Sequence, residues 1–181
     1  MTMDAATAKR VETEHDDPVK LIGRQLAVLS TREHALLRRM YLTGKPAADG
    51  AVIKLLHHAG VTPARYERDY PAWRLLTHVA ALLSGTGKEQ PHSRRAGFGT
   101  ALQAAGYSEN RLLRLTAARG AALHDHIILA GRMLARAGKA PVNLRTLLDL
   151  AGRDPDKAEQ ARLRIAQDYY AAAARPEGDA K

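Results

Sequence analysis

The stretch AWRLLTHVAALLS, residues 72–84, decides the fold class of this 181-residue chain. Its apolar side chains recur at three- and four-residue intervals, which places them on one face of an α-helix. The residues of this face are Trp73, Leu76, Val79, Ala80 and Leu83. Because strand-like alternation is absent along the chain, the sequence predicts an all-α protein.

Small polar caps, first-turn prolines and terminal glycines divide the rest of the chain into further helices. Asp17, Ser108, Asn143 and Asp154 are expected N-caps, and Ser30 with Glu33 forms a capping box. The helices expected around residues 72–84 are 17–29, 30–43, 51–59, a segment from 62 that Pro71 breaks or kinks, one ending at 106, 108–119, 121–137, one from 143, and 154–174. This pattern predicts a compact bundle of about eight to ten helices.

Glycine, proline and polar residues fill positions 85–93, which makes this run the best candidate for a mobile loop. A division into two lobes joined around residues 85–95 stays open. Residues 1–17 carry two cations against five carboxylates, so we expect an acidic N-terminal tail. A single helical domain is expected over residues 18–174, followed by a short C-terminal tail at 175–181.

The charge of the chain favours an acidic partner such as nucleic acid. The net charge is +9 and the sequence pI is near 10.1. Between Arg94 and Arg153, nine arginines and one lysine face only three carboxylates. There is no cysteine, which excludes disulfides, thiolate catalysis and cysteine-bound zinc. No apolar run approaches the roughly 20 residues of a membrane span, and no signal peptide is recognisable, so we expect a cytoplasmic protein without membrane contact.

Arginine pairs at helical spacing are the candidate contacts to phosphates. Arg111 and Arg114 lie one turn apart, Arg132 and Arg136 repeat the arrangement, and Arg162 and Arg164 flank Leu163. Any single arginine is more often a solvated surface charge, but the whole set lacks enough carboxylates to neutralise it. Aromatic residues are sparse, and Trp73, Tyr169 and Tyr170 are expected in the core. Binding through phosphates with little base readout is therefore predicted.

Motifs that could carry catalysis do not form a site. His124-Asp125-His126 resembles the centre of a histidine-aspartate phosphohydrolase, but adjacent side chains on a helix point about 100° apart. Gly85 to Lys88 lacks the spacing and the preceding strand of a phosphate-binding loop. We therefore expect no enzyme activity, no metal site and no cofactor.

Four blocks in a fixed order resemble the CasB family, the small subunit of the type I-E CRISPR surveillance complex Cascade. They span roughly residues 20–172. The blocks are Leu36 to Arg39; Trp73 to Gly85; Phe98 to Leu102 with Glu109 to Leu115; and Val142 to Leu144 through Leu147-Leu148 to Ala166–Tyr170. The resemblance implies a non-catalytic, all-helical subunit present as two copies. It also implies contacts with the backbone and large subunits of Cascade, and with the displaced DNA strand of the R-loop that crRNA forms on its target.

The resemblance and the charge pattern together give a set of predicted nucleic-acid-binding residues. They are Arg38, Arg39, Arg68, Arg74, Arg111, Arg114, Arg132, Arg162 and Arg164. Two other classes of protein stay open. A helical DNA-binding regulator would present short polar side chains to base edges. A purely structural subunit would use its arginines on acidic protein partners. A salt titration against nucleic acid separates such a subunit from a protein that binds nucleic acid.

Overall fold

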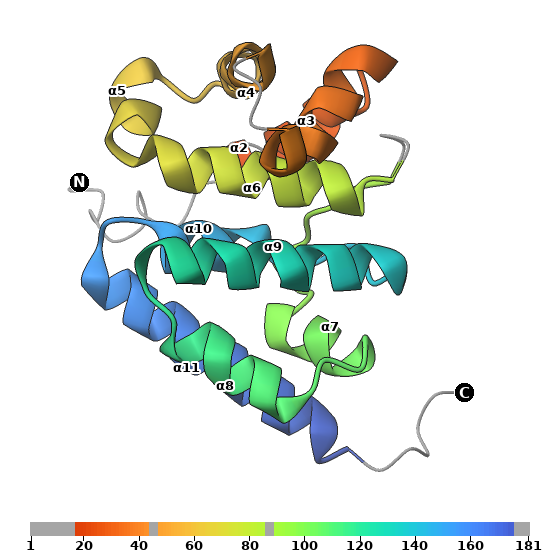
Figure 1. Cartoon of the computed structure of the whole chain (residues 1–181), viewed down its shortest axis with the longest axis vertical. Coiled ribbons are helices and arrows are strands. Elements are labelled where there is room, and N and C mark those ends of the chain that lie inside the picture. Colours follow the sequence, from red (N-terminus) through yellow and green to blue (C-terminus); the bar gives the residue numbers. More distant parts are fainter. Residues whose placement is uncertain (1–16, 44–46, 86–88, 176–181) are drawn as a thin grey trace, which may run out of the picture.

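The computed structural model describes residues 17–43, 47–85 and 89–175, and these residues are mostly helical (Figure 1). The first half contains α2 (Pro18–Leu26), α3 (Thr31–Thr43), α4 (Ala47–His58), α5 (Pro63–Tyr66), the 3-10 turn η1 (Glu67–Asp69) and α6 (Tyr70–Leu83). The second half contains α7 (Phe98–Ala104), α8 (Glu109–Ala117), α9 (Gly120–Arg136), α10 (Leu144–Ala151) and α11 (Pro155–Ala173). The all-α prediction is confirmed.

Helix α6 lies at the centre of the molecule, as Figure 1 shows. It packs on α2, α3 and α4 on one side and on α9 and α10 on the other. Trp73, Leu76 and Val79 are at most 2% exposed, and α6 also buries Thr77 and His78. The hydrophobic core therefore runs without interruption from Val19 to Tyr169. No helix in the described part of the chain is long and apolar enough to cross a membrane.

Most helix ends follow their predicted signals. Asn143 accepts a hydrogen bond from the Arg145 amide at 3.1 Å, and Asp154 accepts two in the first turn of α11. In the capping box, the Ser30 amide donates to Glu33 at 3.0 Å and the Glu33 amide donates to Ser30 Oγ at 3.2 Å. The terminating glycines at 60, 106 and 138 all have positive φ. Gly44, the predicted end of the second helix, lies outside the described residues.

One predicted boundary was wrong, and two of the predicted signals act differently from the expectation. Helix α4 begins at Ala47 rather than at 51, because Ala48 packs into the core and is 1% exposed. Pro71 does not break a helix: it sits in the first turn of α6, where its missing N–H has no helical partner to lose. Ser108 precedes α8 but its side chain makes no capping hydrogen bond.

The structure confirms Asp17 as the predicted N-cap of the first helix, and it places this residue inside the fold rather than in the acidic tail. It caps α2 by accepting from the Val19 amide at 3.1 Å, and only 1% of its side chain is exposed. Its carboxylate accepts from Arg94 Nε at 2.7 Å and faces His92 Nε2 at 3.5 Å. The reason for the error is that the partners of Asp17 come from a distant part of the sequence. Residues 1–16 lie outside the described residues.

The end of the predicted mobile loop is held in place. His92 and Val142 form an isolated bridge, in which the Val142 amide donates to the Pro91 carbonyl at 3.1 Å. The Leu144 amide donates to His92 Nδ1 at 3.1 Å. These bonds fix the segment before α7 to the start of α10, while residues 86–88 lie outside the described part.

Candidate nucleic-acid interface

Helices α8 and α9 form a groove lined mainly by cationic side chains. The two helices follow one another in the chain and pack together (Figure 1). The groove has a volume of about 510 Å³. Its lining residues are Tyr107, Arg111, Arg114, His126, Leu129, Arg132, Met133 and Arg136. No carboxylate lines it.

The amphipathic pattern of each helix explains why the arginines face outward. Leu112 and Leu115 of α8 are at most 1% exposed, and this burial turns Arg111 and Arg114 toward solvent. On α9, the buried face includes Ile127, Ala130 and Leu134. Arg132 and Arg136 lie one turn apart on the side of α9 that faces α8. The groove therefore collects one arginine pair from each helix.

The arginines of the groove have no anionic partner in the described part of the chain. Arg114, Arg132 and Arg136 make no ion pair within 4.0 Å there, and Arg111 Nη1 contacts only Met133 Sδ, at 3.7 Å. Four positive charges thus converge on a hollow in which no carboxylate of the described residues neutralises them. Such a surface attracts a polyanion, and arginine suits phosphate oxygens through its planar fork.

Other arginines in the sequence are held by carboxylates. Arg119 and Arg162 share Glu159, at 2.8 and 3.0 Å. Arg74 binds Asp49 at 2.7 Å and lies over the ring of Tyr41. The Arg119–Glu159 and Arg74–Asp49 bonds connect different parts of the fold, whereas the Arg162–Glu159 bond lies within α11. The charge of these arginines is neutralised within the protein, unlike the charge of the arginines in the α8–α9 groove.

The nine predicted site residues therefore do not form one surface. Arg111, Arg114 and Arg132 come together in the groove, and the structure adds Arg136, which the sequence places one turn from Arg132. Arg38 and Arg39 are exposed on α3, and Arg38 donates to the Gly85 carbonyl at 3.3 Å. The other four residues lie in four different places. Arg68 lines a second hollow, and Arg164 lies on the outer surface of α11. Arg74 is paired with Asp49, and Arg162 is paired with Glu159.

Of the two arginines that flank Leu163, the structure exposes Arg164 and buries Arg162, which the sequence had predicted to bind nucleic acid. Leu163 is 62% exposed, whereas Arg162 is 7% exposed and belongs to the buried side of α11. Burial lowers the pKa of Arg162, and the nearby charge of Arg119 acts in the same direction, against the attraction of Glu159. We leave Arg162 out of the proposed surface. Arg164 is exposed and has no ion pair in the described part.

Tyr107 and His126 were missed because each reaches the groove through tertiary packing. Tyr107 precedes α8 and is 3% exposed, and its carbonyl accepts from the hydroxyl of Tyr169 at 2.6 Å. Tyr169 is buried as predicted, but Tyr170 is 43% exposed and donates to Glu109, so its assignment to the core was wrong.

The histidine motif does not assemble on one face. His126 lines the α8–α9 groove, whereas His124 lines a different hollow beside Arg119 and Glu159. This is the consequence of the roughly 100° step between neighbouring helical positions. The described residues contain no cluster of three or more His, Cys, Asp or Glu that could hold a metal ion.

The fold and the groove define a class: a basic, all-helical protein whose unpaired arginines gather between two neighbouring helices. The sequence profile of the family described as CRISPR-associated protein Cse2 matches residues 33–170. The chain therefore belongs to the Cse2 family, also called CasB, which confirms the sequence resemblance.

A solved structure supports the fold. The crystal structure of CasB from Thermobifida fusca superposes with a TM-score of 0.51 at 16% sequence identity. The match covers 83% of this chain and 98% of that chain. At this identity the likeness concerns the fold alone. No curated protein matches the sequence.

Proposed function

We propose that this chain is a non-catalytic small subunit of Cascade that holds the displaced DNA strand in the α8–α9 groove during R-loop formation. Family membership supports the Cascade assignment. The observation that supports the groove is the convergence of Arg111, Arg114, Arg132 and Arg136 without a carboxylate partner in the described residues. In such a complex, base pairing with the guide reads the sequence and protein contacts hold the backbone.

The chemistry of the groove favours phosphates over base edges. Asn and Gln side chains, which read adenine, do not line it. Its apolar members, Leu129 and Met133, offer contact to sugars and bases without sequence discrimination. This argues against the alternative of a sequence-reading helical regulator. The further alternative, arginines that bind only acidic proteins, predicts no affinity for nucleic acid.

Single-strand affinity as a function of salt tests the proposal. Four phosphate contacts give a log–log slope of about −3, since each contact on a single strand contributes about −0.7. The double variant Arg114→Ala/Arg132→Ala removes one arginine from each helix and spares the buried leucines. We expect its slope to fall in magnitude by about 1.4, with equal loss of affinity for all sequences.

A matched control is the double variant Arg24→Ala/Arg32→Ala. Both residues are exposed, on α2 and α3, and lie outside the groove. The control loses the same net charge and should retain the wild-type slope. Equal slopes in the two double variants would show that the α8–α9 groove is not the binding site, and a flat salt response in the wild type would exclude backbone binding altogether.

A further inference from the structure

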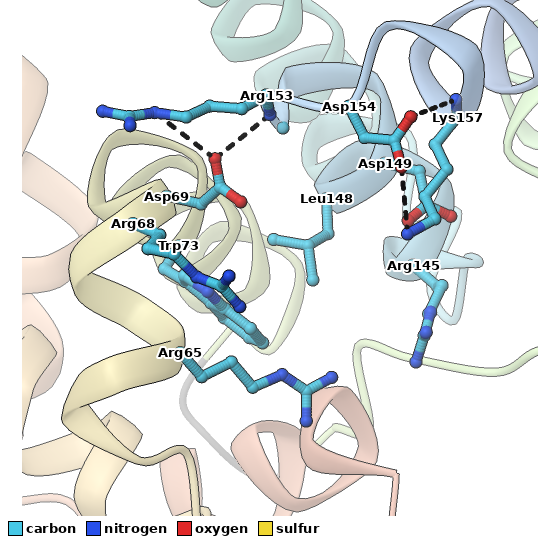
Figure 2. Close-up of a pocket in the computed structure, with 11 residues that line it drawn as sticks. Arg65, Arg68, Asp69, Trp73, Arg145, Leu148, Asp149, Arg153, Asp154 and Lys157 are labelled. Atoms are coloured by element: carbon cyan, nitrogen blue, oxygen red, sulfur yellow. Dashed lines mark hydrogen bonds and ion pairs between the residues drawn. The ribbon is translucent and has the colours of Figure 1, made fainter.

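A second cationic hollow lies between α5–α6 and α10–α11 (Figure 2). Trp73 and Leu148 form its apolar floor. Five cationic residues and three carboxylates surround them, which leaves a net charge of +2. The cations are Arg65, Arg68, Arg145, Arg153 and Lys157, and the carboxylates are Asp69, Asp149 and Asp154.

Two of the carboxylates are already engaged. Asp69 accepts from the backbone amide of Arg153 at 3.1 Å and faces its side-chain Nε at 3.9 Å (Figure 2). Asp154 caps α11 and pairs with Lys157 at 3.2 Å. These contacts hold the α10–α11 turn against η1, so they shape the hollow while neutralising part of its charge.

Three guanidinium groups around the floor make no ion pair, or only a long one, within the described residues. The Arg65 guanidinium lies 5.8 Å from the centre of the Trp73 ring. Arg68 makes no ion pair within the described residues. Arg145 reaches only Asp17, at 3.9 Å, and that carboxylate already accepts from Arg94 at 2.7 Å. This supply of unused donors is what an added anion would satisfy.

Asp149 is the one carboxylate that faces this group without a hydrogen bond or ion pair in the described part of the chain. Burial raises the pKa of Asp149, although Arg145 and Lys157 act in the opposite direction. A carboxylate with this environment weakens the attraction of the hollow for anions. It therefore provides a position at which anion affinity can be increased by substitution.

The size of the hollow limits the ligand. Its volume is about 210 Å³, below the roughly 300–1,000 Å³ of pockets that enclose small molecules. A phosphate group fits this space, whereas a complete nucleotide would extend out of it. The walls come from helices and from a turn that is fixed at Asp69, so the backbone that carries the donors is ordered before any ligand binds.

We propose that this hollow is a second phosphate-binding site, which takes one phosphate of a nucleic-acid strand between Arg65, Arg68 and Arg145. It stands on different residues from the α8–α9 groove and goes beyond the function proposed for that groove. Gly152 and Arg153 line this hollow and also the adjoining one, which contains Arg119. Cationic side chains thus continue past the hollow toward the end of α8.

Trp73 provides a direct reading of this site because it is the only tryptophan in the chain. We would follow its fluorescence while adding pyrophosphate, and separately a 15-nucleotide oligo(dT), at constant ionic strength. Both ligands should change the emission by drawing Arg65 away from the indole. Arg68→Ala should weaken both about tenfold, the loss of one charge-assisted contact. Asp149→Asn should tighten both about threefold by removing a like charge.

Two controls separate this proposal from that for the groove. Arg24→Ala loses one charge on α2, outside both sites, and should titrate as the wild type. Arg114→Ala/Arg132→Ala should leave the pyrophosphate response unchanged, so the hollow is tested even if the groove does not bind DNA. The proposal is overturned if Trp73 does not respond to pyrophosphate, if Arg68→Ala and Asp149→Asn titrate as the wild type, or if pyrophosphate binds and oligo(dT) does not.

Discussion

Replacing Asp17 by Asn should destabilise the fold through loss of charge rather than loss of the helix cap. Asn caps helices about as well as Asp, so the bond from the Val19 amide has a replacement acceptor. What disappears is the negative charge that faces Arg94 at 2.7 Å and His92 at 3.5 Å. The substitution therefore isolates the electrostatic part of this contact between α2 and the segment before α7.

The expected loss is about 2 kcal/mol. A hydrogen bond to a charged group contributes about 1.5–3 kcal/mol. The lower half of this range applies to the Arg94 bond, because the Arg94 side chain is 48% exposed and water can replace its partner. The His92 side chain is only 2% exposed, so water cannot replace the Asp17 carboxylate as the partner of His92 Nε2.

The pH dependence gives an independent check. Burial of the Asp17 carboxyl favours its neutral form, but hydrogen bonds from His92, Arg94 and the Val19 amide, with the Arg94 charge, outweigh burial and lower the pKa of Asp17 strongly. The unfolded chain, with an ordinary Asp pKa near 3.9, takes up the proton first as pH falls. The stabilisation that the ionised Asp17 provides is complete above about pH 5 and declines below it, by about 1 kcal/mol at pH 3.

Urea unfolding of wild type and variant at pH 7 and pH 3 measures both effects. The difference between wild type and variant in the free energy of unfolding should narrow by about 1 kcal/mol at pH 3. Asp154→Asn is the matched control: it is also an N-cap before proline, but it is exposed and pairs only with Lys157. This control should change the free energy of unfolding much less than Asp17→Asn does. A loss below about 0.5 kcal/mol for Asp17→Asn, or a gap independent of pH, would refute the reasoning.

Two further predictions concern buried contacts. Gly99→Ala should lower the free energy of unfolding by about 3 kcal/mol, because its Cβ would meet the backbone of α11, including the Tyr169 amide nitrogen at 2.7 Å. The control Gly50→Ala has open space around it and should raise the free energy of unfolding by about 0.5–1 kcal/mol. Equal effects of the two variants in urea unfolding would contradict the close packing at Gly99. Burial lowers the pKa of His78 to about 4, so the free energy of unfolding should decline as the pH falls from 6.5 to 4. The free energy of unfolding of His78→Leu should decline less over this range, and the lowered pKa of His34 accounts for part of the decline that remains. Parallel plots of stability against pH for wild type and His78→Leu would contradict this prediction.

Local signals in the sequence were enough to predict the helices. A cap side chain bonds to an amide two or three residues away, as Asn143 and Asp154 do, so its effect is contained in a short window. The face of α6 is equally local, because its period follows from helix geometry. The boundary at α4 could not be found this way, since Ala48 is fixed by packing against other helices.

The candidate site required tertiary information. Arg162 and Arg164 look equivalent beside Leu163, yet α11 turns Arg162 inward to Glu159 and leaves Leu163 in solvent. A short polar helix pattern does not say which side faces the core when alanine occupies much of that side. Arg119 pairs with Glu159 across 40 positions, and Arg94 pairs with Asp17 across 77. Sequence spacing alone carries no information about such partners.

The ion-pair partners of the arginines distinguish the arginines that stabilise the fold from those that are available for binding. Arg94 and Arg74 each bind a carboxylate from another part of the chain, so their removal leaves a counter-charge without its cation and disturbs the contacts around it. Arg114 and Arg132 leave no such partner behind in the described residues, and their neighbours on the buried side keep the helices packed. Loss of nucleic-acid binding on their removal would therefore report the groove itself. A net charge of +9 predicts the class of partner, while the pairing pattern predicts where that partner is held.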